Sequence, residues 1–256
     1  MRNAETWKPS RFIEKNGRHV ITTDPSELAP TSRINARLAV AIYNRIIPEH
    51  TRGHFLDLGC GKAPFYKLYR PYCDEITCVD WTASGHGNPY TDLSADLSKP
   101  LPLADQQFDT ILLSSVLEHL PDPGLALSEC YRVLKPNGKL LMNVPFLYGL
   151  HEIPFDYFRY TEYGLRQLTA CANLNTIEVI PLGGGLHVAA DHLCKWIGGG
   201  GMIKLTIIKA IDTALDLVHA VPAIRKREIA SATQYPSGYI GVFQRPASAE
   251  GGLDAA

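Results

Sequence analysis

The 256-residue sequence predicts an α/β protein with a doubly wound, mostly parallel sheet that helices cover on both faces. Short apolar runs of strand length alternate with segments of helical periodicity along most of the chain. The first clear run, Phe55-Leu56-Asp57-Leu58, is followed at once by Gly59-Cys60-Gly61. A glycine turn at that point is typical of the carboxyl end of a parallel strand, where open α/β sheets bind ligands.

The composition narrows the class of protein. Apolar residues make up 45% of the chain and charged residues 20%, so the chain can bury a core and is not disordered. The balance of 25 Lys+Arg against 26 Asp+Glu argues against nucleic acid as the main partner. The six cysteines form no Cys-x-x-Cys pair, which suits reduced thiols and a cytoplasmic location. The polar first ten residues predict no signal peptide.

The order of the elements follows from these patterns. Residues 1–30 are polar and predict an irregular arm that packs on the domain or covers a site. A helix is expected from about Ser32 to Ile47, where Pro48 ends it. Further strands are expected at Ile76–Asp80, Thr110–Ser114, Lys139–Val144, Ile177–Pro181 and Tyr239–Arg245.

Helix starts carry their own signals. Pro64 falls where the first turn of a helix after the glycines is expected. Asp122 and Pro123 predict an N-cap and first turn, opening a helix through Val133, and Thr161 predicts the cap of a helix to Ala172. The stretch Lys135-Pro136-Asn137-Gly138 predicts a turn.

A nucleotide site is indicated by residues at the strand ends. Gly59 and Gly61 allow a sharp turn and a close approach to a ligand. Asp80 ends the second strand 23 residues after Asp57, where a carboxylate can accept hydrogen bonds from two ribose hydroxyls. The dinucleotide fingerprint is not complete, because its third glycine would fall at Pro64.

A family resemblance rests on a larger ordered set of motifs. In chain order these are Phe55-Leu56-Asp57-Leu58-Gly59-Cys60-Gly61, Val79-Asp80, Ala95-Asp96-Leu97, Phe108-Asp109, Val116-Leu117-Glu118-His119-Leu120 and Leu134-Lys135-Pro136-Asn137-Gly138-Lys139-Leu140. Over roughly residues 50–180 the set resembles class I S-adenosylmethionine-dependent methyltransferases. The resemblance implies their Rossmann-like fold with seven strands, an antiparallel last strand at Tyr239–Arg245, and S-adenosyl-L-methionine as cofactor.

The same resemblance implies roles for individual residues. Asp57, Gly59 and Gly61 would line the methionine moiety. Asp80 would hold the ribose, and Ser114 would lie beside the sulfonium.

The adenine side departs from the family pattern. By resemblance, Trp81 would lie beside the adenine, Asp96 would receive its amino group and Leu97 would pack on the ring. Asp80 and Asp96 are only 16 residues apart, with Gly85, Gly87 and Pro89 between them, so the usual intervening helix must be very short or missing.

The acceptor site is expected in the segment His151-Glu152-Ile153-Pro154-Phe155-Asp156-Tyr157-Phe158-Arg159-Tyr160-Thr161, which follows a strand end. Aromatic side chains that alternate with polar ones suit a shaped pocket, with Asp156, Tyr157 and Arg159 as substrate-binding residues. The segment resembles methyltransferases of sugars, glycans and secondary metabolites. The structural alternative is that Phe155, Phe158 and Tyr160 fill the core and Arg159 pairs with Asp156.

A hydroxyl acceptor must lose its proton, and His is the natural base near neutral pH. His151 and His119 are the two candidates, with His151 slightly preferred because His119 also suits a cap of the following turn. Glu118 is either a base or a helix-start carboxylate. No metal site is expected: His187, Asp191, His192 and Cys194 lie close in sequence but complete no known ligand pattern.

The predicted organisation is an arm at 1–30, one methyltransferase domain at 31–245 with a helical insertion at about 186–235, and a tail at 246–256. Met202–Val221 is amphipathic and not a membrane span; it packs on the core or rim, forms a homodimer face or touches a membrane surface. The expected function is O-methylation of a small molecule, a sugar, glycan precursor or secondary metabolite. N- or C-methylation, a silent cofactor-binding scaffold and a nicotinamide oxidoreductase are the alternatives.

Overall fold

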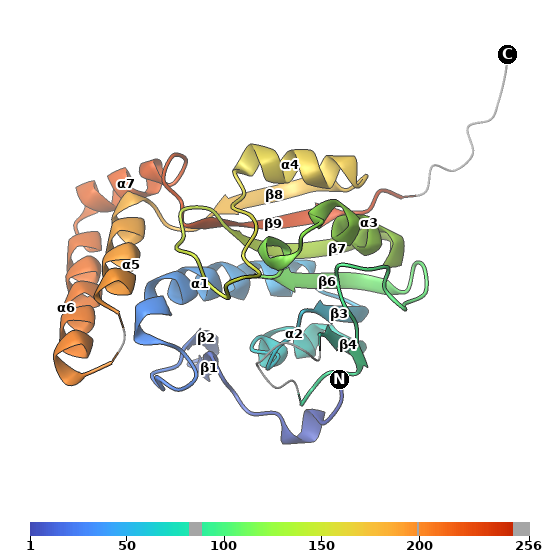
Figure 1. Ribbon diagram of the computed structural model, residues 1–256, viewed down its shortest axis with the longest axis horizontal. Coiled ribbons are helices and arrows are strands. Elements are labelled where there is room, and N and C mark those ends of the chain that lie inside the picture. Colours follow the sequence, from blue (N-terminus) through green and yellow to red (C-terminus); the bar gives the residue numbers. More distant parts are fainter. Residues whose placement is uncertain (82–88, 199, 248–256) are drawn as a thin grey trace, which may run out of the picture.

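The computed structural model describes residues 1–81, 89–198 and 200–247. Seven strands form one sheet in the order β5-β4-β3-β6-β7-β9-β8 (Figure 1). The strands are β3 (His54–Leu58), β4 (Glu75–Asp80), β5 (Leu93–Ser94), β6 (Phe108–Ser114), β7 (Leu134–Pro145), β8 (Asn175–Pro181) and β9 (Gly238–Gln244). All neighbours pair in parallel except β9, which runs antiparallel to β7 and β8. The predicted seven-stranded, mostly parallel α/β fold is therefore confirmed.

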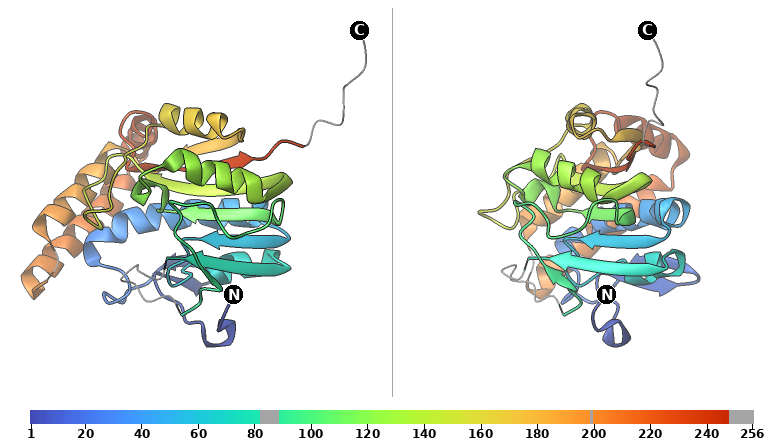
Figure 2. Two further views of the ribbon diagram at one scale, coloured as in Figure 1. Left: turned by 45° about the vertical axis from the view of Figure 1, so that its right-hand side comes forward. Right: turned by 90° about the vertical axis from the view of Figure 1, so that its right-hand side faces the viewer.

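Helices cover both faces of the sheet, as Figure 2 shows. The described helices are α1 (Arg33–His50), α2 (Tyr66–Tyr69), α3 (Pro123–Val133), α4 (Glu162–Cys171), α5 (Gly185–Ile197), α6 (Met202–His219) and α7 (Pro222–Ser231). Short 3-10 turns are η1 (Ala4–Thr6), η2 (Pro30–Ser32), η3 (Arg70–Tyr72) and η4 (Leu117–His119). Among the helices in the described ranges, none combines the length and the apolar character that crossing a membrane requires.

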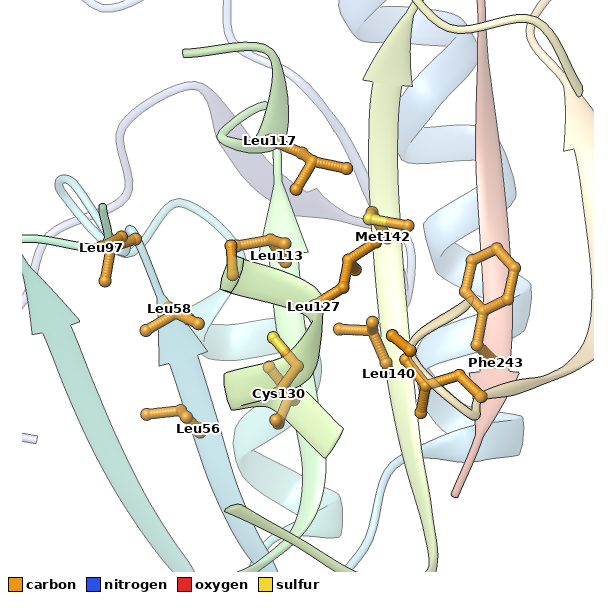
Figure 3. Packing of buried hydrophobic residues seen from close by; sticks show 14 of the residues in the cluster. Leu56, Leu58, Leu97, Leu113, Leu117, Leu127, Cys130, Leu140, Met142 and Phe243 are labelled. Carbon is orange, nitrogen blue, oxygen red and sulfur yellow. The ribbon is translucent and has the colours of Figure 1, made fainter. Parts of the chain in front are cut away.

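Alternation along the strands produces a separate core on each face. On one face α3 places Leu127 and Cys130 against Leu113 and Leu140 of the sheet (Figure 3). On the other face the side chains of α1 and α2 pack on neighbouring strand positions such as Leu112. Both layers hold the central strands in register, which fixes the edge where β3, β4, β6 and β7 end.

The expected helix starts at Asp122 and Thr161 are present. The Asp122 carboxylate accepts from the N–H of Leu125 at 3.0 Å, and the Thr161 hydroxyl accepts from the N–H of Gly164 at 3.0 Å. The expectation that Pro48 ends the first helix is wrong, since α1 continues to His50. Its last turn is held by packing of Ile47 and His50, both buried.

Two further local expectations need correction. The helix after the glycines begins at Tyr66, two residues beyond Pro64, and is only four residues long. The turn at Lys135–Gly138 is instead an irregular start of β7, with Asn137 at a φ of 62° and a register shift against β6. The Asn137 N–H donates to the carbonyl oxygen of Arg245 at 3.0 Å, so the stretch stays within the sheet.

The N-terminal arm is not irregular throughout, because β1 (Phe12–Lys15) and β2 (Arg18–Ile21) form an antiparallel hairpin. Asn16 and Gly17 make its turn, with φ of 52° and 71°. Positive φ at both central residues is the geometry that Asn-Gly favours in two-residue hairpins. This signal was present in the sequence.

Helices α5, α6 and α7 lie together at one end of the molecule (Figure 1), and α5 and α6 share a small core around Cys194, Ile208 and Leu215. They occupy the segment between β8 and β9. The expected tail falls largely outside the described residues, which end at 247.

Candidate functional site

The ends of β3 and β4 are joined at the glycine turn. The N–H groups of Gly59 and Cys60 donate to the carbonyl oxygen of Val79 at 2.8 and 3.2 Å. The Gly61 N–H donates to Oδ2 of Asp80 at 2.6 Å, and the Trp81 N–H donates to Oδ1 of the same carboxylate at 2.7 Å. The structure thus brings together the glycine turn and the acid predicted to hold a ribose.

The two glycines have different surroundings. Gly59 has a φ of 78°, and a Cβ there would lie 2.4 Å from a side-chain carbon of Val116. Gly61 has a φ of 50°, and a Cβ there would meet nothing within 4 Å. Gly59 is therefore required by close packing, whereas Gly61 borders open space beside Asp80. That space fits the approach of a cofactor to the backbone.

Asp57 is a buried acid below this turn. The Tyr69 hydroxyl donates to its Oδ2 at 2.9 Å. Burial raises the pKa of Asp57 to about 7, and the neighbouring charge of Asp80 adds to the increase. Two acids at this edge are electrostatically suited to the cationic amino and sulfonium groups of S-adenosylmethionine.

The predicted adenine residues are only partly placed beside the turn. Trp81 is 41% exposed, and its ring meets that of Phe155 edge to face, with centroids 6.1 Å apart. The Asp96 carboxylate already accepts from Ser98 and pairs with Lys99 at 3.0 Å. Leu97 is buried in the hydrophobic core. Residues 89–92 form no helix, whereas Gly85 and Gly87 lie outside the described residues.

The N-terminal part of the chain also reaches this edge. The hydroxyl of Tyr43, on α1, donates to Oγ of Ser114 at 2.9 Å. The Trp7 indole N–H donates to the carbonyl oxygen of Ala63 at 3.1 Å, directly after the glycine turn. Sequence reasoning did not single out Tyr43 or Trp7, because neither belongs to a motif near the site.

The predicted acceptor loop is tied to η4. The N–H groups of Tyr157 and Phe158 donate to the carbonyl oxygen of Glu118 at 2.9 and 3.3 Å. The Tyr160 hydroxyl donates to the carbonyl oxygen of Leu117 at 3.0 Å. The loop is therefore fixed to η4, which follows β6, by two backbone hydrogen bonds and one from a side chain.

The loop divides into a structural and an exposed part. Both nitrogens at the end of Arg159 lie 2.6 Å from the Asp156 carboxylate, and hydrogen bonding to Arg159 lowers the pKa of Asp156 to about 2. Tyr160 is buried, as the structural alternative expects. Phe155 and Tyr157, in contrast, are 49% and 47% exposed, so they are not core residues.

The most concentrated group of ionisable side chains lies between the loop and η4. The rings of His119 and His151 meet edge to face, with centroids 4.8 Å apart. Nε2 of each lies 3.8 Å from Oε1 of Glu118. The Glu118 side chain is 1% exposed, and its Oε2 has no hydrogen-bond partner among the described residues. Burial lowers the pKa of His151, but the Glu118 and Asp156 carboxylates outweigh this and raise it above its ordinary value.

Four potential metal ligands of the helical segment do not form a ligand set in the described part of the chain. They are His187, Asp191, His192 and Cys194. His187 Nδ1 lies 2.6 Å from the Glu228 carboxylate, and Asp191 pairs with Lys195. Cys194 is packed in the core of the helical segment. In the described part of the chain, these residues contact structural partners.

The sheet order, the glycine turn after β3 and the acid after β4 agree with the resemblance to class I S-adenosylmethionine-dependent methyltransferases. Comparisons with known proteins agree, since residues 56–142 match the methyltransferase domain family. The chain is an S-adenosylmethionine-dependent methyltransferase, an enzyme whose cofactor is S-adenosylmethionine.

The curated relatives described here cover between half and about two thirds of the chain. A protein of Mycolicibacterium smegmatis, described as a probable S-adenosylmethionine-dependent methyltransferase, is 26% identical over 182 residues, or 68% of this chain and 70% of that protein. A protein of Mycobacterium tuberculosis with the same description is 29% identical over 68% of this chain and 66% of its own length. The demethylmenaquinone methyltransferase of Renibacterium salmoninarum is 35% identical over 51% of this chain and 60% of its own.

Solved structures agree on the fold. A methyltransferase from Mesorhizobium loti is 13% identical with a TM-score of 0.52, covering 83% of this chain and 100% of its own. The [4+2]-cyclase SpnF is 16% identical with a TM-score of 0.53, covering 93% and 87%. At these identities the likeness concerns the fold alone.

Proposed function

We propose that this methyltransferase transfers a methyl group to a hydroxyl oxygen of a small molecule. The observation that carries the proposal is the cluster of His119, His151 and Glu118 at the sheet edge where β6 and β7 end. S-adenosylmethionine supplies a methyl group already activated on its sulfonium. The chain must then align the acceptor oxygen and accept its proton.

The cofactor-binding roles follow the geometry of the first two strand ends. We propose that Asp57, Gly59 and Gly61 line the methionine part and that Asp80 binds the ribose, with Ser114 beside the sulfonium. The hydrogen bond from Gly61 to Asp80 and the open space at Gly61 support this assignment. The adenine roles of Trp81, Asp96 and Leu97 remain predictions, with weaker support because Asp96 and Leu97 already have local partners.

His151 is the preferred proton acceptor. Its side chain is 29% exposed, against 15% for His119, and Nδ1 of His119 lies 2.7 Å from the carbonyl oxygen of Phe155. His151 is thus the imidazole of the pair that a substrate reaches more easily. His119 would then help to hold the acceptor loop.

A sugar, glycan precursor or secondary metabolite is the proposed class of acceptor. The rings of Trp81, Phe155 and Tyr157 are exposed, and Trp81 meets Phe155 edge to face, so these rings can stack on a flat or ring-shaped molecule. Arg159 and Asp156 would shape this wall through their mutual pairing. Methylation at oxygen is supported by one relative, the malonyl-[acyl-carrier protein] O-methyltransferase of Erwinia billingiae, 31% identical over 38% of this chain and 41% of its own.

The test is a methyl-transfer assay with labelled S-adenosylmethionine and a panel of sugar, phenol and amine acceptors. We expect a methyl ether product and at least a tenfold loss of rate in His151→Ala. His192→Ala is the matched control, because His192 is an exposed histidine on α5. A product methylated at nitrogen or carbon, identified by NMR, would contradict the assignment to oxygen.

We also propose a cytoplasmic location and a homodimer. The location is supported by the six cysteines, all of which are free thiols. The homodimer is supported by exposed apolar side chains on α6, including Ile203 and Leu217.

A further inference from the structure

Three potential ligand atoms converge at the proposed acceptor site. Oε1 of Glu118 and one ring nitrogen each of His119 and His151 all lie within 4.8 Å of one another. Each Nε2 is 3.8 Å from Oε1, which is too long for a hydrogen bond. The three side chains therefore face one another without bonding directly.

Neighbouring groups orient both imidazoles toward this common point. Nδ1 of His119 lies 2.7 Å from the carbonyl oxygen of Phe155, which can only accept, so Nδ1 carries a hydrogen, and in the neutral ring Nε2 presents its lone pair. Nδ1 of His151 lies 3.3 Å from the Gly149 carbonyl oxygen and 3.4 Å from the Asp156 carboxylate. Metal-ligating histidines are commonly held in this way by a carbonyl or carboxylate on the other nitrogen.

In the described ion pairs the Glu118 carboxylate faces the two imidazoles but no lysine or arginine. Its side chain is 1% exposed, and Oε2 is buried with no hydrogen-bond partner in the described ranges. A buried carboxylate is costly unless a cation or donors neutralise it. The point that both Nε2 atoms face is therefore suited to a cation.

We propose that Glu118, His119 and His151 bind a divalent first-row transition-metal ion. Metal–nitrogen and metal–oxygen distances of about 2.1 Å place neighbouring tetrahedral ligands about 3.4 Å apart. The observed 3.8 Å separations need only small side-chain shifts to reach this geometry. Two imidazoles and one carboxylate suit Zn²⁺, Fe²⁺ or Mn²⁺ better than Mg²⁺, and three protein ligands leave a position open.

A second group of potential ligands differs from the Glu118 cluster in its neighbouring charges. Glu49, His50 and Glu178 also lie close enough to hold a metal. There, however, Arg45 pairs with Glu178 at 2.8 Å, and Lys139 Nζ lies 2.9 Å from Nδ1 of His50. Protein cations already neutralise that site, whereas none of the described ion pairs provides Glu118 with a lysine or arginine.

The role of the metal, though not its binding, rests on the proposed O-methyl transfer. The acceptor hydroxyl would occupy the open position, where coordination lowers its pKa and the proton leaves to water. The resulting oxygen anion would attack the methyl carbon as the carbon–sulfur bond breaks, and its electron pair would stay on sulfur as S-adenosylhomocysteine forms. Both imidazoles would then be ligands, and water would take the proton that the proposed function assigns to His151.

Binding is tested by titrating chelator-treated full-length protein with Co²⁺ and recording visible absorption. We expect bands of a four- or five-coordinate cobalt site at one equivalent, with displacement by Zn²⁺. Glu118→Gln and His151→Ala should each weaken the affinity at least tenfold, whereas His50→Ala and His192→Ala should leave it unchanged. A thermal shift with S-adenosylhomocysteine in each variant checks that the variant is folded.

The outcomes separate the site from the proposed function. No cobalt bands, or equal affinity in Glu118→Gln and wild type, overturns the metal site. Metal binding with the expected variant losses, but without any methylated hydroxyl acceptor, upholds the site and overturns the proposed function. Full methylation by protein kept metal-free with chelator overturns the catalytic role of the ion.

Discussion

Gly59 and Gly61 illustrate how two residues of one motif perform different tasks. Both adopt positive φ, which costs an L side chain about 1–2 kcal/mol. In Gly59→Ala the new Cβ also overlaps Val116, so we expect an additional loss of about 1–3 kcal/mol of stability. In Gly61→Ala the Cβ enters open space, so only the backbone cost applies to the free protein.

Cofactor affinity, in contrast to stability, should fall clearly in Gly61→Ala. If the cofactor occupies the space beside Gly61, Gly61→Ala should weaken S-adenosylhomocysteine binding at least tenfold while remaining well folded. Thermal unfolding gives the stability and isothermal titration the affinity. Wild-type affinity in Gly61→Ala would show that the cofactor does not occupy that space.

Asp57 makes stability depend on pH. Its folded pKa of about 7 lies above the ordinary value near 3.9, so between these values the folded state retains a proton that the unfolded state has lost. Stability of the free protein should therefore fall as the pH rises through this window, and level off above it. Asp57→Asn should remove much of this fall, an effect on the order of a few kcal/mol, in denaturant unfolding followed from pH 4.5 to 8.

Asp57 should also release its proton when a cation binds beside it. If Asp57 contacts the cofactor amino group, binding of S-adenosylhomocysteine at pH 6.5 should release a proton from wild type and not from Asp57→Asn. Titration calorimetry in buffers of different ionisation enthalpy detects that release. Equal release from both proteins would place the titrating group elsewhere.

Sequence reasoning at this scale succeeded where residues share one local motif. Asp57, Gly59 and Gly61 lie within five residues, so the turn that joins them to the strand end could be predicted. The Glu118, His119 and His151 cluster could not, because its distances depend on how the loop after β7 folds against η4. Each histidine was a candidate alone, but the shared carboxylate was visible only in three dimensions.

At the scale of elements, Glu129 connects α3 to the loop before β6. Its carboxylate accepts from Arg132 at 2.7 and 2.9 Å and from the N–H of Leu101 at 2.7 Å. Hydrogen bonding to Arg132 lowers the pKa of Glu129. A lowered folded pKa stabilises the protein above the unfolded value near 4.3, and this contribution is lost as the pH falls through the folded pKa.

Glu129→Gln should therefore cost about 1–3 kcal/mol at pH 7 and progressively less below pH 4. Urea unfolding at pH 7 and pH 3 measures the difference. Glu49→Gln is the control, because the exposed pair of Glu49 with Arg45 contributes little at any pH. A loss in Glu129→Gln that is the same at both pH values would show that packing, and not charge, is responsible.

Elements with strong local signals were predicted well, and those that depend on tertiary packing were not. The caps at Asp122 and Thr161 fixed the starts of α3 and α4. The end of α1 was missed because buried Ile47 and His50 hold the last turn despite Pro48. β5 was missed because two residues carry no periodicity.

At the scale of the whole molecule, the strand order explains why distant residues share one site. β3, β4, β6 and β7 end at the same edge, so segments following Leu58, Asp80, Ser114 and Pro145 meet there. Alternation of strands and helices was sufficient to predict the parallel part of this sheet, whereas the seven strands and the antiparallel β9 were expected from the family resemblance. The placement of α5, α6 and α7 was not predictable, because their apolar faces fit several kinds of neighbour.

The proposed homodimer should form through the exposed apolar side chains of α6. Ile208 and Leu215 bury one face of α6, while Met202, Ile203 and Leu217 remain exposed. A second copy of the chain would remove these side chains from water, at about 25 cal/mol for each Å² of apolar surface covered. We expect a dimer by light scattering at micromolar concentration and a monomer for the double variant Ile203→Glu, Leu217→Glu. A matched variant, Tyr163→Glu, changes an exposed aromatic residue on α4 and should remain dimeric. A wild-type monomer that instead binds lipid vesicles through α6 would replace the dimer with a membrane-surface role for this helix.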